Sequence, residues 1–363
     1  MLKALELVFY FFFIQASLLI PGYVIAKNIK IFGARDDLRL IVSYVISIAV
    51  FALLGTLAYT TNLPRSILIA VNILYMGLAI VFFFKQKLYK SLFAFRFVIA
   101  SVVIASSLTL AILALDFSGP QKYFPDPENR ADRNYNTLSV KVLNIAQTNA
   151  NDNYIPYRQA QFFYNQSNPI EDSFISEWGV SFFQRTPLLG AVTANYFIFL
   201  HDAPPIDYTW SNKSNDPERT YLKFQIIAVI FNWLFLIPSF FLLRKIFNDQ
   251  TAFLSLLFLI TSQFFIYNAI FSWPKSIVAF FVLSSWLYLM ENRRKYTLIA
   301  GSAAGLAYLF HDLAVFYTGT SVLYLWIKKR YLDSVLFSII AALLMAPWLL
   351  ITNHLFKNQS SFI

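Results

Sequence analysis

The sequence predicts an all-α membrane protein with about ten transmembrane helices and one long extracytoplasmic loop that carries interfacial helices. Three observations support this fold class. Of the 363 residues, 58 % are hydrophobic and only 13 % are charged, which is too apolar for an ordinary soluble protein. Apolar runs of roughly 20 residues, the length needed to cross the hydrocarbon layer, recur along the chain. A single long polar interval, 117–220, interrupts them.

The apolar runs divide into four before the polar interval and six after it. They lie at 4–26, 40–60, 66–84, 97–116, 221–243, 250–271, 275–290, 297–311, 313–327 and 332–352. The eighth and ninth runs are short, and only His311 and Asp312 separate them. A single bent element there would reverse the direction of the final span.

The basic residues predict how these spans are oriented. Sixteen Lys and Arg residues fall in alternate short turns, whereas the opposite short turns hold only Arg65 and Lys275. The sixteen are Lys27, Lys30, Arg35, Arg39, Lys85, Lys87, Lys90, Arg96, Arg244, Lys245, Arg293, Arg294, Lys295, Lys328, Lys329 and Arg330. Because basic turns face the cytoplasm, we expect the N-terminus, the polar interval and the C-terminus outside.

The polar interval should contain short helices. Asn151-Asp152-Asn153 is a helix N-cap signature, and 154–165 has one apolar face, which predicts an interfacial helix. Residues 186–200 are apolar but too few to span, so they predict another interfacial or re-entrant segment. The interval also holds most of the carboxylates of the chain, so we expect chemistry on a polar substrate here. They include Asp126, Asp132, Asp152, Glu171, Asp172, Glu177, Asp202, Asp207 and Glu218.

Several function classes lack support in the sequence. The formal charge of +10 is spread in small groups between apolar runs, which does not favour nucleic-acid binding. There is no cysteine, and three scattered histidines give no metal-binding spacing. No nucleotide-binding glycine motif is present. We therefore expect no cofactor and no metal ligands, although the need for a divalent metal stays open.

Asp152 and Arg185 are the leading candidates for chemistry. Asp152 could cap the interfacial helix, or act as a general base that takes a proton from an acceptor hydroxyl. Asp126 and Asp132 are rival bases. Arg185, at the border of loop and membrane, could anchor in the interface, or bind a phosphate and stabilise a departing one.

Three further residues lie at the predicted outer ends of spans. Lys275 lies in one of the short turns that hold few basic residues, and it could be a second phosphate contact or an interfacial anchor. His311 and Asp312 form an ionisable pair near membrane depth, which is a functional hypothesis unless the turn is simply solvated. They follow the small-residue run at 301–305, which suits close helix packing.

Several short stretches together resemble the GT-C membrane glycosyltransferases. This family includes bacterial relatives of the dolichyl-phosphate-mannose protein mannosyltransferases and of the lipid A aminoarabinose transferase. The stretches are Asn151-Asp152-Asn153-Tyr154-Ile155-Pro156-Tyr157, Arg185-Thr186-Pro187-Leu188-Leu189, Phe271-Ser272-Trp273-Pro274-Lys275 and Gly305-Leu306-Ala307-Tyr308-Leu309-Phe310-His311. The resemblance implies a seven-helix module over 97–352, preceded by a three-helix segment over 1–96 and followed by a tail over 353–363.

The resemblance implies an enzyme of a bacterial inner (plasma) membrane that moves a sugar from a polyprenyl-phosphate donor to a cell-envelope acceptor. The acceptor would be a glycan, lipid or protein on the periplasmic side. Asp152 would match the acidic residue of the family. Arg185, Lys275, His311 and Asp312, with Tyr157 and Arg158 of the interfacial helix, would bind the substrate.

Two other functions fit the same topology. A transporter or flippase of lipid-linked sugars would use the polar interval as a gate and make no bond. A polymerase or ligase subunit of surface polysaccharide would share the lipid-linked substrate.

Overall fold

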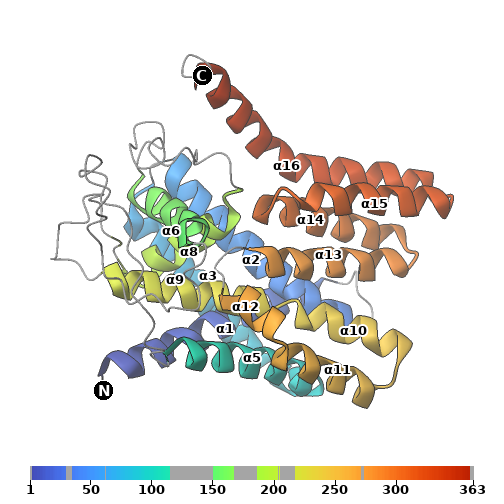
Figure 1. The fold of residues 1–363 in the computed structure, drawn as a ribbon, viewed down its shortest axis with the longest axis horizontal. Helices are drawn as coiled ribbons and strands as arrows, with labels where there is room; N and C mark the ends of the chain where they lie inside the picture. Colours follow the sequence, from blue (N-terminus) through green and yellow to red (C-terminus); the bar gives the residue numbers. More distant parts are fainter. Residues whose placement is uncertain are drawn as a thin grey trace.

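A computed structural model describes residues 2–29, 35–61, 63–114, 150–166, 186–202, 204, 217–270 and 274–359. All regular secondary structure in these ranges is helical (Figure 1). The α-helices are α1 (Leu2–Asn28), α2 (Asp36–Thr60), α3 (Arg65–Lys85), α4 (Leu88–Leu92), α5 (Arg96–Ala114), α6 (Ala150–Asn165), α8 (Leu188–Phe199), α9 (Pro217–Trp233), α10 (Leu236–Ile246), α11 (Asp249–Thr261), α12 (Gln263–Ile270), α13 (Lys275–Met290), α14 (Arg294–Phe310), α15 (Ala314–Ile327) and α16 (Tyr331–Gln359), with the short 3₁₀ helix η2 (Phe93–Phe95).

Six helical stretches in the described ranges are long and apolar enough to cross a membrane. They are Leu5–Asn28, Asp36–Thr60, Arg65–Lys85, Leu88–Ile112, Thr220–Ile246 and Tyr331–Leu350. The pair α11 and α12, bent by 62° between its halves, makes a seventh if it counts as one span. These lengths indicate a multi-pass membrane protein.

The count of ten spans stays a prediction. The helix α13 has 16 residues and α15 has 14, so they measure about 24 Å and about 21 Å at 1.5 Å per residue, against a hydrocarbon core of about 30 Å. The final helix α16 continues through most of the expected tail and ends at Gln359.

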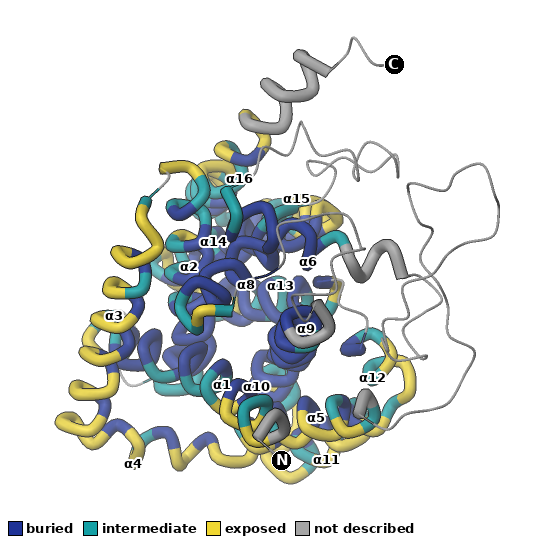
Figure 2. Tube along the Cα trace, turned by 90° about the vertical axis from the view of Figure 1, so that its left-hand side faces the viewer, coloured by how far each residue is buried: buried dark blue, intermediate teal, exposed yellow. Residues whose placement is uncertain are grey.

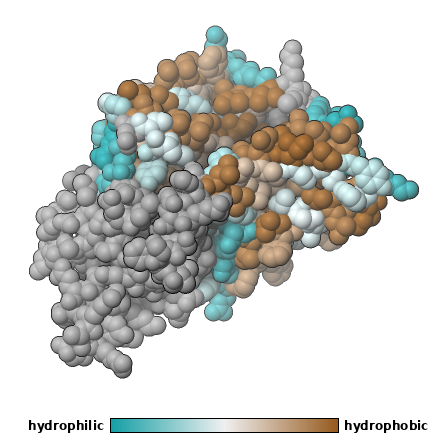
Figure 3. All heavy atoms as spheres, turned by 90° about the horizontal axis from the view of Figure 1, so that it is seen from above, coloured by the Kyte–Doolittle hydropathy of each residue, from teal (hydrophilic) through white to brown (hydrophobic). Residues whose placement is uncertain are grey.

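The joined helices α9 and α10 form the centre of the molecule. In their most apolar stretch 83 % of the residues are buried, against 28 % in α3 and 17 % in α16. Figure 2 shows α8 and α9 buried at the centre and α3 and α4 exposed at the edge. Because α3 exposes Ile73, Leu74, Val81 and Phe84, its outer face is suited to lipid. Figure 3 shows broad hydrophobic areas on the described surface.

The small-residue run predicted for close packing lies where α14 meets α16. A Cβ atom at Gly305 would lie 3.0 Å from the carbonyl oxygen of Ala341 and 2.8 Å from the Cβ of Leu344. A side chain at this position would force the two backbones apart. The predicted packing role of this run is confirmed.

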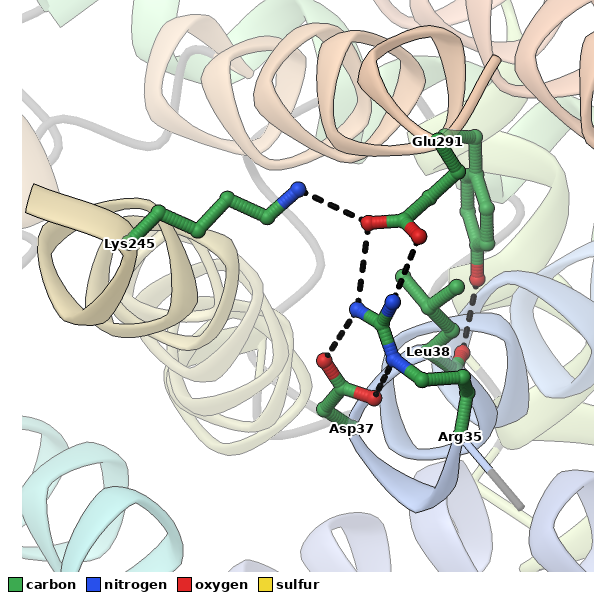
Figure 4. Close-up of polar contacts among 6 residues, drawn as sticks. Arg35, Asp37, Leu38, Lys245 and Glu291 are labelled. Carbon is green, nitrogen blue, oxygen red and sulfur yellow. Dashed lines mark hydrogen bonds and ion pairs between the residues drawn. The ribbon is translucent and has the colours of Figure 1, made fainter. Parts of the chain in front are cut away.

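One end of the bundle is joined by an ionic network (Figure 4). Arg35 donates to both carboxylate oxygens of Asp37, at 2.9 and 2.8 Å, and also pairs with Glu291. Lys245 Nζ donates to Glu291 Oε1 at 2.8 Å. These residues come from the start of α2, the last turn of α10 and the turn after α13. Burial by itself raises the pKa of Glu291, but the hydrogen bonds from Lys245 and Arg35 hold its pKa below the ordinary value.

The two other basic turns reach the same end. Gln86 Nε2 donates to Asn28 Oδ1 at 3.5 Å, and Arg330 Nη1 donates to the Leu289 carbonyl at 2.8 Å. Residues from all five basic turns are thus linked, and their predicted grouping at one end is confirmed. The assignment of that end to the cytoplasm stays a prediction.

Candidate functional site

The helix α6 lies across the opposite end of the bundle. The Tyr157 hydroxyl is 2.7 Å from Thr220 Oγ1 at the start of α9, and Gln166 Nε2 donates to the Ala58 carbonyl near the end of α2 at 2.8 Å. Arg65, at the start of α3, donates to the Tyr164 carbonyl at 3.1 Å. Its guanidinium carbon also lies 4.1 Å from the centre of the Tyr164 ring. The helix therefore connects the ends of three other helices.

The burial of α6 differs from what an interfacial amphipathic helix would show. The polar side chains Arg158, Gln159 and Gln161 are as buried as the apolar Phe162 and Phe163. Arg158 Nη1 donates to Gln161 Oε1 at 3.0 Å, and its guanidinium carbon lies 5.2 Å from the centre of the Phe162 ring. Buried polar groups need such partners because desolvation is costly. The sequence pattern predicted that only the apolar face of this helix is buried, whereas in the structure the polar face is buried as well.

The short helix α8 packs against α2, α3 and α6. At 12 residues it measures about 18 Å, too short to span. Its close approach to α2 depends on Gly55, because a Cβ atom there would lie 1.9 Å from the Ala191 carbonyl oxygen. Gly190 similarly lets α8 approach α6, since its Cβ atom would lie 2.6 Å from the Cβ of Gln159.

Two buried polar contacts hold α8 in place. The side-chain amides of Asn72 and Asn195 exchange two hydrogen bonds of 3.0 Å, which join α3 to α8. The Tyr196 hydroxyl is 2.7 Å from Ser17 Oγ, which joins α8 to α1. Each of these side chains is fully buried. Such contacts between membrane helices fix one packing arrangement, because an unsatisfied polar group in an apolar setting is costly.

A buried lysine pairs with two carboxylates at the same end. Lys223, the seventh residue of α9, has only 3 % of its side chain exposed. Its ammonium is 2.8 Å from Glu6 Oε1 and also pairs with Asp202, just after α8. It lies 5.3 Å from the centre of the Tyr10 ring. We call Glu6, Tyr10, Asp202 and Lys223 the Lys223 cluster.

The charged residues at this end also affect the pKa of Tyr164 in α6. Burial raises the pKa of Tyr164, and Asp202 raises it further, while the opposing effect of Arg65 does not reverse the shift. The Tyr164 phenol therefore stays protonated at neutral pH. It can donate a hydrogen bond there, but it is not a base.

Of the two leading predicted residues, Asp152 and Arg185, the structure describes the backbone position of Asp152 alone. Asp152 lies within the first turn of α6, two residues after Ala150, instead of before the helix as the cap signature suggested. The side chain of Asp152 lies outside the described residues. Arg185 and the rival bases Asp126 and Asp132 lie outside them as well.

The remaining predicted residues fall into two groups. Tyr157 and Arg158 are buried in α6, as described above. Lys275 is the exposed first residue of α13. His311, which is 8 % exposed, follows α14, and its Nδ1 lies 2.7 Å from Oδ1 of the exposed Asp312. The Leu313 amide donates to both side chains. The predicted histidine–aspartate pair therefore forms.

The Lys223 cluster was not predicted, although the sequence contains a signal for it. Glu6 and Lys223 both fall within the apolar runs 4–26 and 221–243. An ionisable residue inside a span is a functional hypothesis by default. What the sequence does not indicate is their common partner Asp202. Within the described ranges, no three His, Asp or Glu side chains gather as metal ligands.

Comparisons with protein-family models, with curated proteins and with solved structures find no match to this chain.

Proposed function

We propose that this protein is an integral-membrane glycosyltransferase that moves a sugar from a polyprenyl-phosphate donor to a cell-envelope acceptor. The position of α6 carries the proposal. The helix α6, with Asp152 in its first turn, lies across one end of a membrane-type bundle. A lipid-linked sugar would present its phosphate and first sugar at this depth.

The proposed chemistry is a direct displacement at the anomeric carbon. Asp152 takes the proton of an acceptor hydroxyl, whose oxygen bonds to the anomeric carbon as the bond to the lipid phosphate oxygen breaks. The phosphate leaves with the electron pair. Arg185, with Lys275 and His311, stabilises its charge.

The Lys223 cluster has a supporting role in this proposal. Because the Lys223 ammonium already faces two carboxylates, it is a poor partner for another phosphate. Its role is to hold the turn after α8 against α1 and α9.

Transport of a lipid-linked sugar is the second candidate, and specific observations favour it. Transporters often use broken helices and buried polar groups near the membrane midplane. Here α11 and α12 are bent by 62°, and the Asn72–Asn195 pair and Lys223 are buried. A transporter would move the lipid-linked sugar between leaflets without forming a product.

A transfer assay in vesicles separates these functions. Purified protein is reconstituted with a radiolabelled polyprenyl-phosphate sugar and a mixture of envelope acceptors. We expect labelled acceptor with the wild type, and at least about a hundredfold less with Asp152→Asn, because general-base catalysis contributes roughly 10²–10⁴-fold. Asp249→Asn, at the ionic end, is the matched control and should keep full activity.

Full transfer by Asp152→Asn would remove this residue from the mechanism. Movement of the donor to the other leaflet with no covalent product would support transport instead. Chain elongation of a glycan acceptor, seen by product analysis, would assign the polymerase or ligase alternative.

A further inference from the structure

A cavity of about 390 Å³ opens at the ionic end of the bundle, away from α6. It is lined by three basic side chains, one carboxylate and two aromatic rings. They are Arg35, Arg244, Lys245, Asp37, Phe95 and Phe241. A cavity of this size accommodates a phosphate group with a small polar substituent.

Three carboxylates pair with the basic residues of the cavity, and two of them, Asp37 and Glu291, engage Arg35 and Lys245. Asp37 accepts two hydrogen bonds from Arg35, and Glu291, behind the lining, accepts from Arg35 and Lys245 (Figure 4). The three guanidinium nitrogens of Arg35 thus already donate to Asp37 or Glu291, so this side chain lines the cavity in a fixed position. Because these paired side chains are already held in place, little conformational entropy is lost when a ligand binds.

Arg244 supplies the uncommitted donors. Its Nε donates to Asp249 at 2.7 Å, and among the described residues its two terminal nitrogens have no hydrogen-bond partner. The side chain of Asp249 is 71 % exposed, so its attraction for Arg244 is largely screened by water. The guanidinium carbon lies 5.8 Å from the centre of the Phe241 ring. An arginine held in this way suits the bidentate binding of a phosphate.

The apolar side of the cavity faces the lipid-exposed surface. Phe95 and Phe241 are buried and pack edge to face at 5.9 Å between ring centroids. Their neighbours Phe93, Phe97 and Ile246 are among the exposed large hydrophobic residues. A ligand with a phosphate and an apolar part could bind both regions at once. Basic cavities between membrane helices are known to bind anionic lipid head groups.

We propose that this cavity is a binding site for a phosphate-bearing anion, with Arg244 as the bidentate contact and Lys245 as the second cation. The head group of an anionic phospholipid and a soluble phosphate compound share this chemistry. The site is separate from the proposed sugar-transfer site at the α6 end. Its ligand would link the start of α2, η2 and the end of α10 and so stabilise the bundle.

The test measures binding by the full-length protein in detergent after lipid removal. Short-chain phosphatidylglycerol, phosphatidylcholine of the same chain length and inorganic phosphate are titrated separately, with the thermal unfolding midpoint as the readout. We expect phosphatidylglycerol to raise the midpoint of the wild type more than phosphatidylcholine does. Arg244→Gln should weaken this binding about tenfold or more, since hydrogen bonds to charged groups contribute about 1.5–3 kcal/mol.

Two further variants make the result specific. Arg293→Gln removes an exposed positive charge at the same end but outside the cavity, and it should bind like the wild type. Arg244→Lys keeps the charge without the fork of donors, so its affinity should fall between wild type and Arg244→Gln. This variant also keeps the test decisive if Arg244→Gln is poorly folded.

The outcomes separate the ligand sources. A larger Arg244-dependent shift with phosphatidylglycerol assigns the cavity to lipid, and an equal Arg244-dependent shift with inorganic phosphate assigns it to a soluble phosphate compound. Equal binding of phosphatidylglycerol and phosphatidylcholine, or no loss in either Arg244 variant, would overturn the proposal.

Discussion

The two ends of the bundle use charged residues in opposite ways. At the ionic end Arg35 and Lys245 are 39 % and 35 % exposed, and they pair with carboxylates from neighbouring turns. At the α6 end Lys223 is 3 % exposed and lies between Glu6 and Asp202. Solvated pairs contribute little to stability, whereas breaking a buried pair leaves a charge that water cannot reach. The difference indicates that the pairs of Lys223 contribute more to stability than the pairs of Arg35 and Lys245 do.

The most disruptive change should be Lys223→Met, which removes the cation and leaves Glu6 and Asp202 facing each other. We expect a loss of about 3–5 kcal/mol in the free energy of unfolding, because the largely buried Asp202 loses the cation with which it pairs. Lys245→Met at the ionic end is the matched control and should cost at most about 1 kcal/mol. Denaturation in mixed detergent micelles measures both, and equal losses would contradict the comparison.

The close contact of α8 with α2 can be tested with two glycines. Gly55→Ala places a Cβ atom against the Ala191 carbonyl and should cost about 1–3 kcal/mol, as overpacking does. Gly77→Ala, on the lipid-facing α3 with no atom within 4 Å, is the control and should be neutral or slightly stabilising. Thermal unfolding midpoints give the comparison. A Gly55→Ala protein as stable as Gly77→Ala would mean that α8 is not packed this tightly.

The smallest effect concerns the pH dependence of the ionic end. Since the folded-state pKa of Glu291 is lowered, its contribution to stability is present above its ordinary pKa and is lost as the pH falls through the folded value. We expect Glu291→Gln to lose stability at neutral pH but to show a flatter acid dependence than the wild type. Unfolding midpoints measured from neutral pH to about pH 3 check this. Parallel pH profiles for the two proteins would show that the ionisation of Glu291 does not contribute to the pH dependence of stability.

The positions of the helices could largely be predicted from the sequence, because apolar runs end at charged or turn residues. The runs 275–290 and 313–327 correspond to α13 and α15 almost to the residue. The break between α9 and α10 was not predicted. It follows from Pro238, which cannot donate to the carbonyl of residue 234 in a continuous helix. The bend between α11 and α12 at Ser262 has no Pro or Gly nearby, and nothing in the sequence explains it.

The candidate site was harder to predict than the helices. Helical periodicity indicates which face of a segment is apolar, but α6 is buried all round because α2, α8 and α9 enclose it. The contacts of Lys223 with Glu6 and Asp202 join residues far apart in the chain. Such pairings depend on tertiary packing, which a single sequence does not specify. The predicted meeting of Asp152 and Arg185 lies outside the described residues and stays a prediction.

The central claim is that a polyprenyl-phosphate sugar reacts at the α6 end. Photolabelling with a polyprenyl-phosphate analogue that carries its reactive group next to the phosphate tests it directly, with the labelled peptides identified by mass spectrometry. We predict labels in the part of α6 that carries Asp152, Tyr157 and Arg158, and excess natural donor should suppress them. Labels confined to the ionic end, near Arg244 and Lys245, would contradict the account.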